Sequence, residues 1–104
     1  MILRIVKMEL IENKIELFEH FMENLKEEKL KQEGCLHHDF FCDKDNCLIF
    51  FSYTIWATEK HLRKYKKTEL FKEVARTLRT FCLKEPVAWT VENVFNSPYD
   101  EEED

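Results

Sequence analysis

The central stretch of the chain, residues 34–56, reads GCLHHDFFCDKDNCLIFFSYTIW. Residues 35–42 and 47–56 are rich in aromatic and β-branched side chains, which favour strands. Between them lies Asp43-Lys44-Asp45-Asn46, which has the composition of a hairpin turn. We therefore predict two antiparallel strands. Gly34, the only glycine in the chain, precedes them, where a helix that turns into a strand needs a left-handed residue.

Outward from this hairpin, the N-terminal third predicts a strand and a helix. Residues 2–10 form an apolar run broken by three charges, which suits a buried or two-sided strand. Asn13 and Glu16 have the spacing of a capping box. A helix is therefore predicted from about Lys14 to Gln32. The residues at helical spacing within it are Phe18, Phe21, Met22, Leu25 and Lys29.

The C-terminal half predicts two helical pieces and a last strand. The first piece runs from Thr58 to about Lys66, and the second starts near Thr68. The apolar stripe of the second piece consists of Leu70, Phe71, Val74, Leu78 and Phe81. Pro86 ends the connection, and residues 88–95 alternate as a strand.

The predicted order is strand, helix, strand, strand, helix, strand, the βαββαβ arrangement of ferredoxin-like α+β domains. Right-handed crossovers place both helical units on one face of a four-stranded antiparallel sheet and leave the other face uncovered. Residues 48–56 are apolar at positions of both parities, so the uncovered face would be apolar in a monomer. We predict a homodimer through this sheet face, giving a dimeric α+β barrel.

Length and charge limit the classes of protein. The 104 residues are 44% hydrophobic and 36% charged, which suits one folded domain, residues 1–95, followed by an acidic tail, residues 96–104, expected to be disordered. Residues 100–104 hold five of the 21 acids, so the remaining 16 acids balance the 16 bases and nucleic-acid binding is not expected. Neither a membrane-spanning run nor a secretory signal is recognisable, so we expect a cytoplasmic protein without a membrane partner.

Four cysteines raise the question of a metal site. No CxxC pair is present, and a reducing cytoplasm favours free thiols. Cys35 and Cys42 flank His37 and His38, but an extended strand would divide these four groups between its two faces. We expect buried thiols and no metal.

Five stretches carry a resemblance to a known family. They are Asn13-Lys14-Ile15-Glu16-Leu17-Phe18, Glu33-Gly34-Cys35-Leu36, Phe50-Phe51-Ser52-Tyr53-Thr54-Ile55-Trp56, Thr68-Glu69-Leu70-Phe71 and Pro86-Val87-Ala88-Trp89. Together they resemble the antibiotic biosynthesis monooxygenase family of dimeric α+β barrels. The resemblance implies the fold already predicted. It does not fix the activity, because the family includes cofactor-independent quinol monooxygenases, haem-degrading enzymes and an epimerase.

Two of these activities lack their residues here. The positions of the haem-degrading branch's Asn, Trp and iron-binding His correspond to Val6, Tyr65 and Ala75, so the axial imidazole is missing. The Glu and His of the epimerase branch correspond to Thr54 and Tyr65, so its acid and base are missing too. No haem or other cofactor is therefore expected.

The monooxygenase-like branch matches better. Its Trp corresponds to Trp56 and its partner Asn to Ser52, which keeps a shorter hydrogen-bonding group. Its Tyr corresponds to Leu62, but Tyr65 lies one helical turn away and could present a hydroxyl to the same space. The resemblance thus implies Trp56, Ser52 and Tyr65 as catalytic residues, to which we add His38 as a candidate base.

Four further residues are candidates for substrate binding. Arg4 could hold an anion, Thr54 offers a hydroxyl, and Phe71 offers an aromatic face. His37 and His38 are adjacent on a strand and so face opposite sides, but the sequence leaves open which of them faces the cavity. As an alternative, Trp56 and Tyr65 anchor the core or the dimer, and Arg4 pairs with an acid.

Three functions remain open from the sequence. The first is a small dimeric, cofactor-independent monooxygenase of quinol-like aromatics, which needs a dry cavity and groups that favour a substrate anion. The second is a noncatalytic module that binds a small aromatic ligand in the same cavity. The third is a structural dimer whose cavity is filled by its own side chains.

Overall fold

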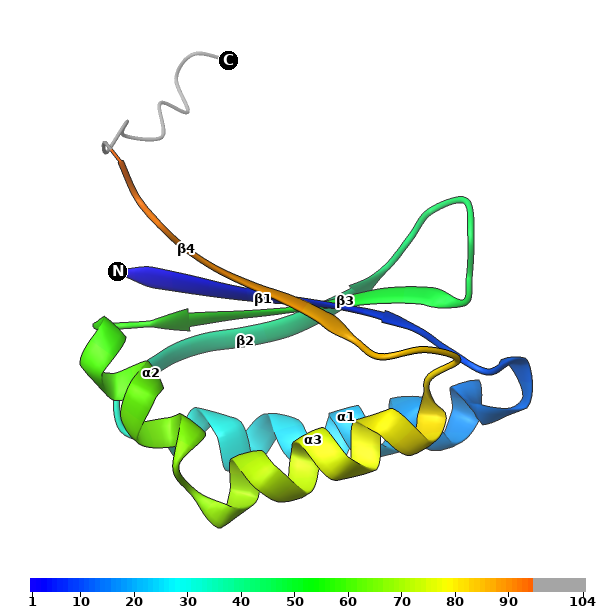
Figure 1. Ribbon diagram of the computed structural model, residues 1–104, viewed down its shortest axis with the longest axis horizontal. Coiled ribbons are helices and arrows are strands. Elements are labelled where there is room, and N and C mark those ends of the chain that lie inside the picture. The colour runs from blue at the N-terminus through cyan, green and yellow to red at the C-terminus, as the bar shows by residue number, and fades with distance from the viewer. Residues whose placement is uncertain (95–104) are drawn as a thin grey trace.

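A four-stranded antiparallel sheet with helices on one face makes up the fold (Figure 1). The computed structural model describes residues 1–94. The elements are β1 (Ile2–Glu9), α1 (Ile15–Leu30), β2 (Cys35–Cys42), β3 (Ile49–Trp56), α2 (Glu59–Lys66), α3 (Glu69–Phe81) and β4 (Val87–Glu92), with a 3-10 turn at Glu12–Lys14. The strand order is β2-β3-β1-β4 with every neighbouring pair antiparallel. The predicted ferredoxin-like α+β fold is confirmed.

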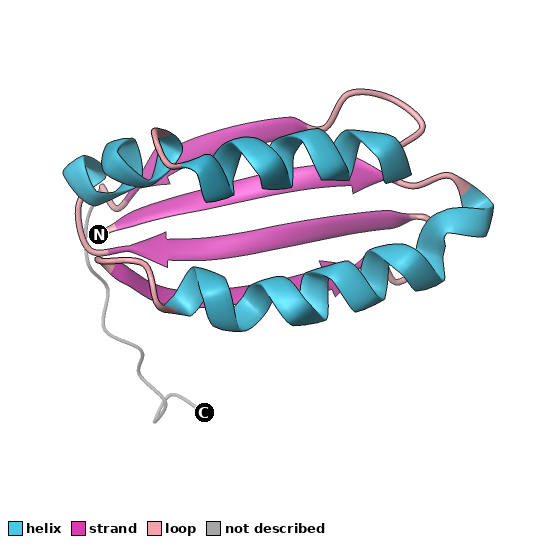
Figure 2. Cartoon of the chain, turned by 90° about the horizontal axis from the view of Figure 1, so that it is seen from below, coloured by secondary structure: helices cyan, strands magenta, loops and turns pink. Residues whose placement is uncertain are grey.

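All three helices lie against the same face of the sheet, as the two perpendicular views show (Figures 1 and 2). Side chains alternate along β3, so that every second residue from Phe50 to Trp56 is buried beneath the helices. The buried apolar residues form two clusters. The larger consists of Met8, Leu10, Phe18, Met22, Leu25, Phe50, Val74 and Cys82, and the smaller of Ile2, Trp56, Leu62 and Tyr65.

Three of the four helix ends predicted from the sequence are confirmed. The Thr58 and Thr68 hydroxyls cap α2 and α3 by accepting hydrogen bonds from the third backbone N–H that follows each. Gly34 has a φ of +83°, as predicted for the turn after α1. The capping box at Asn13 is wrong, because Asn13 lies within the 3-10 turn and α1 begins without a side-chain cap.

Three strands are shorter than predicted: β1 ends one residue early, at Glu9, and β3 and β4 are each two residues shorter. The Asp43 carboxylate accepts hydrogen bonds from the backbone N–H groups of Asp45 and Asn46, at 2.8 and 3.2 Å. The Asn46 side chain in turn accepts one from the backbone N–H of Leu48, so the turn takes two more residues than expected and β3 begins at Ile49. The last strand, β4, ends at Glu92. Residue 95 and the predicted tail, residues 96–104, lie outside the described residues.

The face of the sheet away from the helices is apolar, as predicted. Its central row runs from Tyr53 on β3 through Ile5 on β1 to Trp89 on β4. Trp89 is 46% exposed, and other large apolar side chains that remain exposed on this face are Phe41, Val87 and Val91. This part of the chain therefore carries the uncovered surface on which the prediction of a dimer depends.

All four cysteines are free thiols, but the expectation that they are buried is wrong for three of them: Cys82 is buried, Cys35 is half-buried, and Cys42 and Cys47 are exposed. Within residues 1–94, no group of three or more His, Cys, Asp or Glu side chains is arranged to bind a metal ion. No helix in the same range combines the length and apolar character needed to cross a lipid bilayer.

Candidate active site

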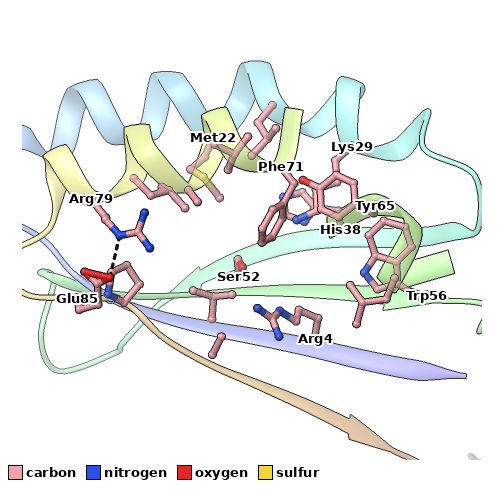
Figure 3. A pocket seen from close by; sticks show the side chains of 18 residues that line it. Arg4, Met22, Lys29, His38, Ser52, Trp56, Tyr65, Phe71, Arg79 and Glu85 are labelled. Atoms are coloured by element: carbon pink, nitrogen blue, oxygen red, sulfur yellow. Dashed lines mark hydrogen bonds and ion pairs between the residues drawn. The ribbon is translucent and has the colours of Figure 1, made fainter. Parts of the chain in front are cut away.

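A cavity of about 180 Å³ lies between the sheet and the helices, where the two core clusters meet. Figure 3 shows its lining side chains, which come from α1, α2 and α3 on one side and from β1, β2, β3 and β4 on the other. A protein cavity of roughly 150 Å³ lined by apolar side chains binds benzene. The volume here therefore fits a molecule with a single aromatic ring.

Six of the eight residues predicted from the sequence line this cavity: Arg4, His38, Ser52, Trp56, Tyr65 and Phe71. They come from five different elements, so the fold brings together residues that lie up to 67 positions apart in the chain. Their roles as catalytic or binding residues remain predictions. The other two predicted residues, Thr54 and His37, lie elsewhere.

Aromatic rings form one end of the cavity. The Trp56 and Tyr65 rings lie 5.0 Å apart between centroids and are tilted by 31°, while the Phe71 ring meets Tyr65 edge-on at 5.5 Å. Trp56 is fully buried and Tyr65 is 4% exposed. Such rings offer a flat aromatic ligand both stacking and edge contacts.

Three polar atoms at this end have no hydrogen-bond partner among the described residues. They are His38 Nε2, Trp56 Nε1 and the Tyr65 hydroxyl, all fully buried. Buried polar atoms are normally paired, and each one left unpaired costs about 1–3 kcal/mol. Desolvation raises the pKa of Tyr65 to about 12, so its hydroxyl keeps its proton at neutral pH. The three atoms therefore predict a polar group of a ligand, or water, in this end of the cavity.

His38 is the histidine that faces the helices. Its Nδ1 lies 3.0 Å from the Thr54 hydroxyl, which holds the ring in place. Thr54 thus supports His38 from within the sheet layer and does not line the cavity. Desolvation, together with the positive charge of Lys29, lowers the pKa of His38 to about 4. The imidazole is therefore neutral at pH 7, and its other nitrogen remains free for a ligand.

His37 does not line the cavity, contrary to its inclusion among the substrate-binding candidates. Neighbouring strand residues point to opposite faces, so His37 lies on the uncovered face of the sheet. There its ring meets Tyr53 edge-on at 5.9 Å, and its Nε2 lies 3.8 Å from the Asp39 carboxylate.

Lys29 is a lining residue that the sequence analysis did not select. Its ammonium lies 5.2 Å from the centroid of the Tyr65 ring, a cation–π arrangement (Figure 3). Desolvation lowers the pKa of Lys29 to about 8, and the nearby positive charge of Arg4 acts in the same direction. The sequence feature that could have identified Lys29 is its helical spacing with the core-facing residues of α1, where a cation is unusual.

Arg4 reaches into the cavity from β1. Its Nη1 donates a hydrogen bond of 2.9 Å to the Thr90 hydroxyl on β4, and burial lowers the pKa of the guanidinium. The acid expected as an alternative partner is therefore not seen among the described residues. Arg4 keeps further N–H groups for a ligand, because a guanidinium has five.

An ion pair lies at the opposite end of the cavity. Arg79 on α3 donates from Nε to a carboxylate oxygen of Glu85 at 2.8 Å (Figure 3). Both residues line the cavity and both are largely exposed. Nothing in the sequence marked this pair, because its position depends on how the connection between α3 and β4 folds back.

Comparison with known proteins decides the family. The sequence profile of the antibiotic biosynthesis monooxygenase family matches residues 1–77, about three quarters of the chain. The chain belongs to this family. The resemblance found in the sequence is thereby confirmed. No curated protein matches the chain significantly.

Solved structures of this antibiotic biosynthesis monooxygenase fold agree closely. A conserved protein from Methanosarcina mazei has 26% sequence identity, with 86% of this chain and 90% of that chain covered and a TM-score of 0.80. SnoaB, a cofactor-independent oxygenase from Streptomyces nogalater, has 14% identity, with 94% and 97% covered and a TM-score of 0.81. A proposed antibiotic biosynthesis monooxygenase from Deinococcus radiodurans has 9% identity, 96% and 99% covered, and a TM-score of 0.87. The latter two share the fold at sequence identities too low to show a shared activity.

Proposed function

We propose that the protein is a cofactor-independent monooxygenase that oxidises a small, quinol-like aromatic molecule in the cavity between sheet and helices. One observation carries this proposal. The cavity is bounded by aromatic rings, and three of the residues that line it, His38, Trp56 and Tyr65, each carry a buried polar atom without a partner among the described residues. Buried polar atoms are normally paired, so the three atoms require a polar partner, and we take this partner to be the oxygen atoms of the substrate.

The volume and the lining residues of the cavity favour a one-ring substrate. Trp56 and Phe71 provide ring surfaces, and the Tyr65 hydroxyl and the Trp56 indole N–H are donors for substrate oxygens. The neutral His38 has a nitrogen available to accept a hydrogen bond from a phenol. Ser52 lines the cavity as a further hydroxyl, at the position of an Asn in the monooxygenase-like branch.

The reaction balances with molecular oxygen alone. A quinol that has lost a proton transfers electrons to O₂, and a bond forms between a ring carbon and one oxygen atom. Loss of the proton from that carbon breaks the O–O bond, so the products are a hydroxyquinone and water. Within this scheme the quinol hydroxyl donates a hydrogen bond to the neutral His38 and its proton passes on to water, while Tyr65 and Trp56 donate to the developing oxygen charges.

Two observations support independence from a cofactor. The solved structure of the Streptomyces nogalater protein, which shares this fold, is described as a cofactor-independent oxygenase. In addition, a volume of about 180 Å³ suits a single ring and is small for a flavin together with a substrate.

The proposed assembly is a homodimer through the uncovered sheet face. The row formed by Tyr53, Ile5 and Trp89 would otherwise leave large apolar side chains in water. A second copy of the same surface is a self-complementary partner.

A noncatalytic aromatic-binding module is the second candidate. Leu62, which takes the position of the Tyr in the monooxygenase-like branch, is buried in the smaller core cluster and offers no hydroxyl. The two candidates share the cavity and differ in whether a bound aromatic is oxidised.

Oxygen uptake separates them. Purified protein freed of metal with a chelator is mixed with a panel of one-ring quinols in an oxygen electrode, beside the Trp56→Phe variant, which keeps an aromatic ring and loses the N–H. We expect oxygen uptake above the spontaneous rate for at least one quinol, and we expect the rate of this uptake to be about tenfold or more lower in the variant. Binding of the quinols without uptake would favour the noncatalytic module.

A further inference from the structure

Two cations converge on the aromatic end of the cavity, from opposite sides. Lys29 comes from α1 and lies over the Tyr65 ring, while Arg4 comes from β1. Among the described residues that line the cavity, Glu85 is the one acid, and its carboxylate already binds Arg79 at the other end. Lys29 and Arg4 therefore face a lining without a carboxylate of its own to neutralise them.

The unpartnered polar atoms lie at the same end as these cations. Trp56 Nε1 and the protonated Tyr65 hydroxyl are hydrogen-bond donors, and both side chains are more than nine-tenths buried. Figure 3 shows Lys29, His38, Tyr65 and Trp56 gathered there, at a distance from the Arg79–Glu85 pair. Hydrogen-bond donors and positive charges without an anion among them are the features of a site that binds a negatively charged oxygen.

We infer that this end of the cavity is an anion-binding subsite, and that the ligand is a one-ring aromatic molecule with a carboxylate or phenolate oxygen directed at Lys29 and Arg4. The inference rests on the proposed function, whose substrate class it narrows from aromatic to anionic aromatic. Lys29 acts as the specificity-determining residue. The aromatic ring of the ligand lies against Trp56 and Phe71.

Binding then depends on the protonation of Lys29. The charged and titratable groups that face it are Arg4 from β1, Cys35 and His38 from β2, and Tyr65 from α2. At neutral pH His38 and Tyr65 are uncharged, and burial raises the pKa of Cys35, so its thiol is protonated as well. Since the pKa of Lys29 is lowered to about 8, the ammonium is present at pH 7 and largely lost by about pH 9.5. The affinity for an anion should fall across this interval.

The test uses benzoate and its neutral counterpart benzyl alcohol, with binding measured by calorimetry. Wild-type protein is expected to bind benzoate about tenfold or more tightly than benzyl alcohol at pH 7, because a charge-assisted hydrogen bond contributes that much. Lys29→Gln should abolish this preference and the loss of affinity above pH 8. Lys26→Gln, one turn earlier on the same helix and exposed, makes the same charge change and should keep both.

A spectroscopic probe separates the two kinds of anion and does not depend on overall affinity. 4-Nitrophenol absorbs at longer wavelength as phenolate than as phenol. Bound to wild-type protein it should shift towards the phenolate spectrum, and bound to Lys29→Gln it should not. A shift combined with weak benzoate binding assigns the subsite to phenolates, and the reverse assigns it to carboxylates.

Three results would overturn the inference: equal binding of benzoate and benzyl alcohol together with an unshifted nitrophenol spectrum, a preference that survives in a folded Lys29→Gln protein, or no binding of any anionic probe. The first would still leave an aromatic cavity, and the oxygenase proposal would be judged on oxygen uptake alone. Conversely, anion binding without uptake of oxygen by any quinol would sustain the subsite and refute the oxygenase.

Discussion

Lys29 is a charged residue that occupies a core-facing position of α1. Its neighbours on that side of the helix, Met22 and Leu25, are buried apolar residues of the larger cluster. Placing an ammonium beside them requires partial loss of its hydration, which is the reason for its lowered pKa. At this residue the needs of stability and of ligand binding are therefore expected to oppose one another.

Replacing Lys29 with Met should stabilise the protein at neutral pH. The unfolded chain keeps the ordinary lysine pKa of 10.5, whereas folding lowers it to about 8. The folded protein consequently disfavours the charged form at every pH below about 8, and this penalty disappears as pH rises from 8 to 10.5. We expect Lys29→Met to raise the free energy of unfolding at pH 7 by roughly 1–2 kcal/mol, measured by urea denaturation. A gain that is the same at pH 10.5 would contradict this origin.

His38 predicts a stability change in acid. Its pKa is lowered from 6.5 to about 4 in the folded protein, so the unfolded chain binds a proton first as pH falls. The stabilising contribution of the neutral imidazole is complete above pH 6.5 and is lost between 6.5 and 4. The His38→Asn variant keeps a polar group for Thr54 and cannot titrate. Its loss of stability from pH 7 to pH 4, measured by denaturation, should be smaller than that of the wild type, and an identical loss would contradict the assignment.

For single residues, the sequence predicted most of the side chains that line the cavity, but not in every case the face of the sheet on which a side chain lies. Alternation along β3 correctly placed Ser52 and Trp56 on the same face, because strand parity is local. Alternation along β2 did not show which of His37 and His38 faces the helices. This strand has a bulge between Cys35 and His37, which shifts the residues after it to the opposite face. The position of a side chain in a bulged strand depends on its partner strand, which the sequence of one strand does not contain.

At the scale of elements, Gly34 sets the turn from α1 into β2. Its φ of +83° is a conformation that other residues rarely adopt, and a Cβ at this position would overlap both the ring and the Cβ of His61. The His61 ring also lies 2.8 Å from the Thr58 hydroxyl and 3.7 Å from the Glu33 carboxylate. The turn after α1 and the start of α2 are therefore packed together.

Gly34→Ala should destabilise the protein by about 2 kcal/mol or more, because it adds backbone strain and a steric overlap. Thermal unfolding followed by circular dichroism measures the change. A second variant separates the two causes. His61 Cβ is among the overlapping atoms, so the second variant is His61→Gly. Gly34→Ala should cost less stability in the His61→Gly background than in the wild type, by the part due to overlap, and the cost that remains is the part due to φ. Full stability of Gly34→Ala alone would show that this turn is not constrained as described.

Element types were predictable from the sequence because each carries its own periodicity, whereas several boundaries were not. The starts of α2 and α3 were predicted at Thr58 and Thr68, and the structure shows that these two residues cap the helices. The start of β3 was misplaced by two residues because Asn46 continues the turn through its side chain. The conformation of this side chain depends on the folded hairpin, so the sequence alone does not predict it.

At the scale of the whole molecule, one layer of helices leaves the apolar sheet face uncovered (Figures 1 and 2). We expect the protein to be a dimer at micromolar concentration, and Trp89→Arg to convert it to a monomer. Trp89 is 46% exposed in the single chain, so the variant should still fold. Leu17→Arg, at a 56% exposed position on α1, is the matched control and should remain a dimer. Light scattering after size exclusion measures both, and a monomeric wild type would contradict the expectation.

We propose that this fold oxygenates a small aromatic molecule in the cavity at Trp56 and Tyr65. Labelling with ¹⁸O₂ tests it most directly, because uptake of oxygen alone would not distinguish an oxygenase from an oxidase. For the quinol that consumes oxygen fastest, we expect one labelled atom in the promptly quenched organic product and the other in water, with both formed about tenfold or more slowly by Trp56→Phe. Product without label, or labelled hydrogen peroxide as the only reduced oxygen species, would contradict it.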